Sequence, residues 1–133
     1  MITKNAIFTK VKTAITGEYT DAYCTSERLY SPPSFPCVWI VEIDTYPELS
    51  STALDFTDNQ RRSDFEIQVY SDKESGAATQ AASIMAVAIA EMRRLGYRCT
   101  MSGPIDNGAD ASIKRHVSRF TRYIGSGDTL PTD

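Results

Sequence analysis

The sequence has few of the residues that carry chemistry in small proteins. Its 133 residues include three cysteines and one histidine, His116. Cys24, Cys37 and Cys99 are odd in number and show neither CxxC spacing nor companion histidines, which argues against a zinc site or a disulfide framework. We expect them to be small buried side chains in a reducing compartment. Because no hydrophobic run approaches the roughly 18 residues of a membrane span and no apolar leader segment is visible, the sequence predicts a soluble protein made in the cytoplasm, without membrane contact.

The common motifs of nucleotide-binding and hydrolytic enzymes are also missing. The chain has no glycine-rich phosphate loop, no HExxH and no GxSxG. His116 lies among cations that we expect to lower its pKa, and no carboxylate near it in the sequence could orient it for catalysis. A net charge of −3 argues against a protein that coats nucleic acid by neutralising phosphates. The sequence therefore predicts no catalytic site, no cofactor and no metal.

What the chain does have is the composition of one globular domain. Hydrophobic residues make up 41% and charged residues 23% of it. A chain of this length buries about two-thirds of its surface on folding, which is enough for a core without disulfides. We expect a single domain over residues 1–124 and a mobile C-terminal tail over residues 125–133, which read GSGDTLPTD.

Apolar periodicity predicts two helices and five strands. The helices are expected over residues 2–15, stopped by Gly17, and 75–95, stopped by Gly96. The buried side of the second is expected to hold Ala78, Ala81, Ala82, Met85, Ala88, Ile89 and Met92. The strands are expected over residues 22–26, 37–44, 63–71, 97–102 and 112–124.

An apolar run and a polar segment precede the third predicted strand. Residues 37–44 are almost continuously apolar, which predicts a strand covered on both faces for most of its length, with Trp39 in the core. Residues 45–62 are polar without periodicity, which predicts a long loop.

The order of these elements does not alternate as in a doubly wound fold. It predicts an α+β domain, a mainly antiparallel sheet of four to five strands with two helices packed on one face. The other sheet face is then either solvated or an interface.

Acidic residues gather on two of the predicted strands. Asp64 and Glu66 share a face by alternation, and a hairpin could bring Glu42 or Asp44 beside them. Clustered carboxylates of this kind can hold Mg²⁺ for phosphodiester cleavage. The nuclease pattern D-x-E-x-K, however, needs a lysine where this chain has Gln68, so a solvated strand face is the preferred interpretation.

The last strand is basic. Arg115 and Arg119 share one face with Val117, whereas Lys114 and Arg122 share the other with Phe120. Two interpretations stay open. The strand is a charged edge that discourages pairing with other chains, or its arginines pair with acidic groups of a neighbouring subunit or line a surface that meets DNA.

The succession of segments resembles the tail terminators of long-tailed bacteriophages, the small tail-completion or head–tail joining proteins. The matching segments are IFTKVKTAI, SPPSFPCVWIVEID, DFEIQVYSDKESG, ATQAASIMAVAIAEMRRLGY and HVSRFTRYIG, which together span roughly residues 5–124. The junction VYSDKESG before the helix is the most specific of them. The resemblance implies a virion structural protein without catalytic activity, assembled in the host cytoplasm. It further implies that the protein forms a ring, usually hexameric, that ends the tail tube and joins it to the neck. The implied partners are the tail tube protein, a head-completion protein and double-stranded DNA that passes without sequence-specific binding.

A ring of this kind suggests roles for the charged residues. An acidic channel repels phosphates and lets DNA slide, so Glu42, Asp44, Asp64 and Glu66 are the candidate channel lining. Arg115, Arg119 and Arg122 are then the candidate subunit interface, although the opposite arrangement, with Arg115 and Arg119 inward, stays open. The alternatives to a terminator are another component of the same particle, namely a head-completion stopper or a tail-tube protein, and a protein of a different class, a small metal-dependent enzyme.

Overall fold

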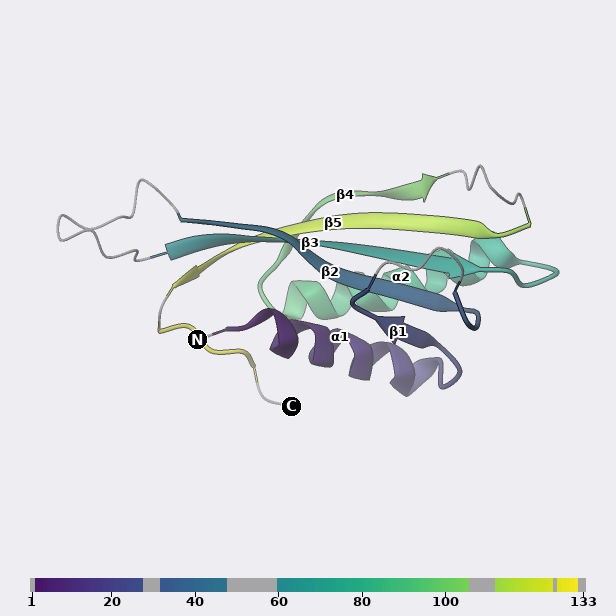
Figure 1. Ribbon diagram of the computed structural model, residues 1–133, viewed down its shortest axis with the longest axis horizontal. Helices are drawn as coiled ribbons and strands as arrows, with labels where there is room; N and C mark the ends of the chain where they lie inside the picture. Colours follow the sequence, from purple (N-terminus) through teal and green to yellow (C-terminus); the bar gives the residue numbers. More distant parts are fainter. Residues whose placement is uncertain (1, 28–31, 48–59, 106–111, 126, 132–133) are drawn as a thin grey trace.

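The computed structural model describes residues 2–27, 32–47, 60–105, 112–125 and 127–131. It shows a five-stranded sheet with two helices on one of its faces (Figure 1). In chain order the elements are α1 (Lys4–Glu18), β1 (Tyr23–Thr25), β2 (Cys37–Pro47), β3 (Gln60–Ser71), α2 (Ala77–Arg94), β4 (Arg98–Ile105) and β5 (Lys114–Gly125). The strand order is β1-β2-β3-β5-β4, and only the β1–β2 pair is parallel. The predicted α+β class is therefore confirmed.

Helix α1 begins at a side-chain cap and runs past the predicted stop. The hydroxyl of Thr3 accepts a hydrogen bond from the backbone N–H of Ala6, 3.2 Å away, which satisfies one of the free amides of the first turn. Ile7 and Ile15 are among the buried residues of its inner side. Gly17 lies inside the last turn instead of ending the helix, because the N–H of Tyr19 still bonds the carbonyl of Ile15.

Helix α2 lies between two glycines with positive φ. Gly76 has φ 82° and Gly96 has φ 89°, a left-handed conformation that favours glycine. Its buried residues are Ala77, Ala81, Ile84, Met85, Ala88 and Met92. The predicted buried side was therefore partly wrong, since Ala78 and Ala82 are exposed and Ile84 is in the core. Alanine is compatible with either side of a helix, so the alanines alone did not locate the stripe.

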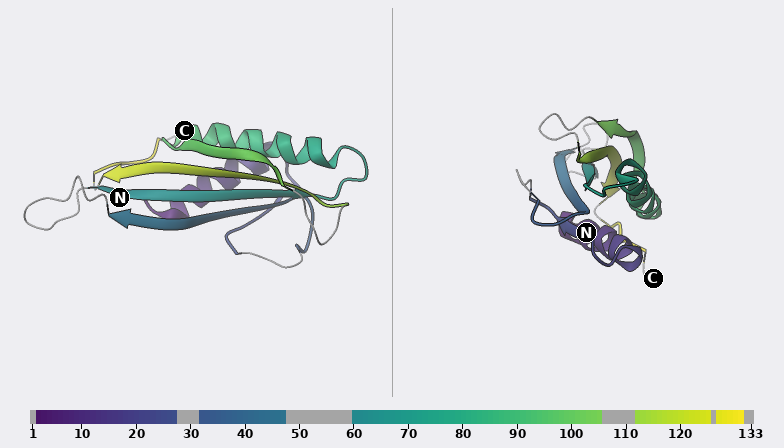
Figure 2. Two further views of the ribbon diagram at one scale, coloured as in Figure 1. Left: turned by 90° about the horizontal axis from the view of Figure 1, so that it is seen from above. Right: turned by 90° about the vertical axis from the view of Figure 1, so that its right-hand side faces the viewer.

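The core lies between the helices and the sheet. Helix α1 packs against β2 and α2, and α2 packs against β3 and β5 (Figure 2). The largest fully buried side chains include Phe65, Phe120 and Ile67 on the helix-facing side of the sheet. Phe65 also meets the ring of Tyr97 edge to face, with centroids 5.6 Å apart.

Strand β2 differs from its prediction in cover and length. Only one face is covered, because both helices lie on the same side of the sheet. Trp39 is half-buried on the uncovered side and is not part of the core cluster, and Ile43 is 43% exposed. β2 continues to Pro47 and β3 starts at Gln60, so the predicted loop over 45–62 is too long at both ends. Residues 48–59 of that loop lie outside the described residues.

Strand β5 is not an edge of the sheet. It lies between β3 and β4, so the interpretation of its arginines as edge protection is wrong. The edges are β1 and β4. Within the described ranges, no helix is long and apolar enough to cross a membrane.

Candidate assembly surface

The sheet face turned away from the helices carries most of the charged strand residues. We call it the open face. The register places Glu66 opposite Arg119, Asp64 opposite Thr121 and Tyr70 opposite Arg115. Alternation along β3 and β5 therefore brings Asp64 and Glu66 of the predicted acidic pattern onto the same surface as Arg115 and Arg119 of the predicted basic pattern.

A cross-strand ion pair stands at the centre of the open face. Arg119 Nε donates to Glu66 Oε1 at 2.9 Å, and Gln68 Nε2 donates to Glu66 Oε2 at 2.9 Å. The hydroxyl of Tyr70 donates in turn to Gln68 Oε1 at 2.6 Å. Both carboxylate oxygens of Glu66 are thus bonded, which explains how this residue is only 9% exposed on an uncovered sheet face.

A second acidic residue is held in the same way. Asp64 Oδ1 accepts a hydrogen bond of 2.7 Å from the hydroxyl of Thr121, and Asp64 Oδ2 lies 3.2 Å from Arg62 Nη2. The carboxylates of Asp64 and Glu66 therefore each have a guanidinium partner on the sheet.

A shallow hollow lies beside these pairs on the open face. It has a volume of about 460 Å³, and its lining includes Arg62, Asp64, Arg98 and Arg119. Two apolar side chains, Ile43 and Tyr123, also line it and are 43% and 49% exposed. Within the described part of the chain, Arg98 makes no hydrogen bond or ion pair. We call this depression the arginine hollow.

The four carboxylates predicted to line a channel do not form one cluster. Asp64 and Glu66 are on the open face, but Glu42 is on the helix-facing side, where its Oε2 accepts a 2.9 Å bond from Ser63 Oγ and lies 3.7 Å from Arg61 Nη1. A bulge between Glu42 and Asp44 sets Asp44 opposite Asp64 in register, and the Asp44 side chain lies outside the described atoms. No group of three or more His, Cys, Asp or Glu residues suited to a metal ion occurs in the described ranges.

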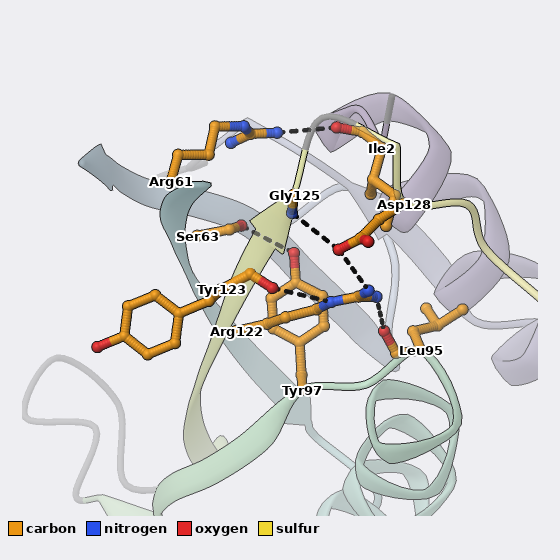
Figure 3. Close-up of polar contacts among 9 residues, drawn as sticks. All are labelled: Ile2, Arg61, Ser63, Leu95, Tyr97, Arg122, Tyr123, Gly125 and Asp128. Carbon is orange, nitrogen blue, oxygen red and sulfur yellow. Dashed lines mark hydrogen bonds and ion pairs between the residues drawn. The ribbon is translucent and has the colours of Figure 1, made fainter. Parts of the chain in front are cut away.

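The three arginines predicted for a subunit interface are also divided between the two faces. Arg115 and Arg119 belong to the open face, whereas Arg122 lies on the helix-facing side and its side chain is 18% exposed. Figure 3 shows that Arg122 donates through Nη1 to the carbonyl of Leu95 at the end of α2 and lies 3.3 Å from Asp128 Oδ2. Asp128 Oδ2 also accepts from the N–H of Gly125 at 2.8 Å.

These contacts involve the segment that we expected to be a mobile tail. Besides Asp128, Leu130 packs against the core cluster. The start of the chain is held nearby, because Arg61 Nη2 donates to the carbonyl of Ile2 at 2.8 Å (Figure 3). Tail mobility over 125–133 stays a prediction, and part of this segment rests on the domain.

Burial shifts the pKa of the single histidine and of two of the cysteines. Burial lowers the pKa of His116, whose Nε2 lies 3.2 Å from Ser102 Oγ, so the cause is desolvation and not the cationic neighbours that the sequence suggested. Burial also raises the pKa of Cys24 and of Cys37 to about 11. Their thiols therefore stay protonated at neutral pH, as expected for structural cysteines.

Sequence reasoning missed the arginine hollow. Arg98, Ile43 and Tyr123 come from three strands, and only the sheet order brings β4 beside β5 and places Arg98 opposite Thr121. The signal that could have suggested the site is the exposed arginine that opens β4.

No family model matches the chain, and no curated protein matches it either. Among solved structures it is similar to a chain described as "Cryo-EM Structure of an Extracellular Contractile Injection System, PVC sheath/tube terminator in extended state". The TM-score is 0.35 and the identity 14%, over 96% of this chain and 60% of that chain. This chain thus spans about three-fifths of the length of the protein it matches. The similarity is too low to transfer a function or a contact.

Proposed function

We propose that the chain is a structural protein of a bacteriophage tail. It forms a ring at the head-proximal end, ends the tail tube, joins it to the neck and leaves a channel for DNA. The proposal starts from the sequence resemblance over roughly residues 5–124. The observation that carries it is the open face, a wide sheet surface that no part of the described chain covers.

The open face is chemically suited to assembly. The carboxylates of Asp64 and Glu66 already have cationic partners, so covering this face does not bury an unpaired carboxylate. Large apolar residues are exposed on the same side, namely Ile43, Met101 and Tyr123. A surface that combines arginines with exposed aromatic and aliphatic groups is typical of protein–protein contacts.

The charged residues take different roles in this proposal. Arg115 and Arg119 belong to the subunit boundary, whereas Arg122 holds the segment around Asp128. Glu66 and Asp64 contribute little to a channel field because Arg119 and Arg62 neutralise them. The acidic channel lining is therefore proposed for Asp44, and Glu42 acts within the fold through Ser63.

The test is the mass of the protein by native mass spectrometry, with and without purified tail tubes, followed by electron microscopy of the tube ends. A closed ring of about six copies on one end of tubes of uniform length supports the proposal. Growth into long fibres identifies a tube protein instead, and a twelve-membered ring identifies a head-completion component.

An enzyme is tested separately. Cleavage of DNA or RNA with Mg²⁺ or Mn²⁺ that Asp64→Asn abolishes contradicts the structural role. A persistent monomer that ignores tube ends contradicts it as well.

A further inference from the structure

We infer that neighbouring copies bind head to tail by opposite charge. The arginine hollow of one copy receives the acidic end of α1 and β1 of the next. This inference rests on the proposed ring and names the contact that builds it.

The arginine hollow has unused positive charge. Arg98 is exposed and has no partner in the described ranges. The side chain of Arg119 is 57% exposed and uses only its Nε for Glu66, so its two terminal nitrogens make no bond to any described residue. Planar guanidinium groups bind carboxylates in pairs of parallel hydrogen bonds. The hollow therefore suits carboxylates presented by another molecule, with Ile43 and Tyr123 as apolar walls.

The acidic end surrounds the connection from α1 to β1: Glu18 ends α1, Asp21 lies on the loop and Glu27 follows β1. Residues 13–27 contain Glu18, Asp21 and Glu27 and no lysine or arginine. All three residues are exposed, and their carboxylates make no hydrogen bond or ion pair to the part of the chain that the structure describes. Lys12 is close enough to lower the pKa of Cys24, and Arg28 follows Glu27 in the sequence, so three carboxylates are accompanied by two cations here. Tyr23, 37% exposed, adds an aromatic ring to the same end.

The two surfaces lie on different sides of the sheet. The arginine hollow is on the open face over β3, β5 and β4, whereas α1 packs on the other face and ends at the right in Figure 1. One copy therefore cannot join its own two surfaces. A contact between unlike surfaces repeats from copy to copy, and it closes into a ring when the rotation per copy permits.

The experiment exchanges the charges. Arg98→Glu and Asp21→Arg are made singly and together, and self-association is measured by native mass spectrometry and sedimentation velocity at low and high NaCl. Each single variant is expected to raise the dissociation constant between copies roughly tenfold or more, because it sets like charges against each other. The double variant is expected to regain most of the lost affinity. Arg93→Glu, the same charge change at an exposed residue of α2 away from the hollow, is the matched control and is expected to associate like wild type.

The outcomes separate this contact from the ring itself. Rings of Arg98→Glu that form as readily as wild-type rings, at all salt concentrations, overturn the contact and leave the proposed function standing. If the double variant regains the lost affinity but the copies never form a closed ring on tube ends, the contact is supported and the ring is overturned. A loss of affinity shared by Arg93→Glu reports only net charge and also overturns the contact.

Discussion

Replacing Gly96 by alanine tests the packing at the end of α2. With φ 89°, Gly96 is in a conformation that costs an L-residue roughly 1–2 kcal/mol, partly offset by about 0.4–1 kcal/mol from the stiffer unfolded chain. A Cβ there would also lie 3.0 Å from Arg122 Nη1 and 3.1 Å from its Cζ. The guanidinium must therefore shift by a few tenths of an ångström, and we expect it to lose at least one of its bonds to Leu95 and Asp128. Hydrogen bonds of charged groups contribute about 1.5–3 kcal/mol, so we expect a total loss of about 2.5–4 kcal/mol in the free energy of unfolding.

Gly76→Ala is the matched control for this change. Gly76 has a similar φ of 82°, but no atom lies within 4 Å of its added Cβ, so we expect a loss of only about 1 kcal/mol. At about 4 °C per kcal/mol, the midpoint of thermal unfolding by circular dichroism falls by roughly 10–16 °C for Gly96→Ala and by about 4 °C for Gly76→Ala.

Making the same two substitutions in an Arg122→Met background separates the cost of the positive φ from the cost of displacing the Arg122 guanidinium. Without the guanidinium, Gly96→Ala should be no more damaging than Gly76→Ala. Equal losses in the wild-type background, or an unequal pair once Arg122 is gone, would refute the assignment of the difference to Arg122.

Three further predictions concern single groups. Tyr97→Phe removes the hydroxyl that lies 2.8 Å from Ser63 Oγ and should lower the free energy of unfolding in urea by about 1 kcal/mol, whereas Tyr123→Phe should leave it unchanged. Burial lowers the pKa of His116, so the unfolded chain binds the proton first and the free energy of unfolding should fall as the pH drops below 6.5. His116→Gln should lack this contribution to the pH dependence of the free energy of unfolding between pH 7.5 and 5.5. An equal pH dependence in the two proteins would count against this prediction. Burial raises the pKa of Cys37 from 9.0 to about 11, so its thiol should resist alkylation by iodoacetamide at pH 8. The free energy of unfolding should also fall as the pH rises from 9 toward 11, because the thiol ionises first in the unfolded chain. Mass-spectrometric labelling of Cys37 at the rate of a denatured sample would contradict the burial.

Much of the fold could be predicted because local patterns carry it. The alternation of Phe65, Ile67 and Val69 located β3 and its buried side, and Gly96 located the end of α2. The start of α2 was predicted two residues early, because Gly76 was placed inside the helix. The apolar run of β2 was misleading for a physical reason. Trp39 and Ile43 look like core residues in sequence, but both lie outside the core cluster, and Ile43 is exposed on the open face.

The candidate site was harder to predict because it depends on strand order. Glu66 and Arg119 are 53 residues apart, and nothing local in the chain indicates that they are bonded. The register pairs Glu42 with Phe65 on the helix-facing side, which is why the predicted carboxylate cluster is divided, and the bulge after Glu42 sets Asp44 opposite Asp64. Arg119 lies on the open face, whereas Arg122 lies on the helix-facing side, where it bonds the carbonyl of Leu95 and the carboxylate of Asp128.

The position of β5 between β3 and β4 also has a consequence for how the protein is made. β2–β3 and β4–β5 are each antiparallel neighbours in sequence, but β3 meets β5 only after α2 and β4 have been synthesised. Until Lys114–Gly125 has left the ribosome, β3 and β4 have no strand between them, and each presents an unpaired edge. Closing the sheet joins two preformed halves through contacts distant in sequence, which is a slow step in folding. A chain truncated before β5 is therefore expected to aggregate, and protection from hydrogen exchange should appear last along the β3–β5 pair.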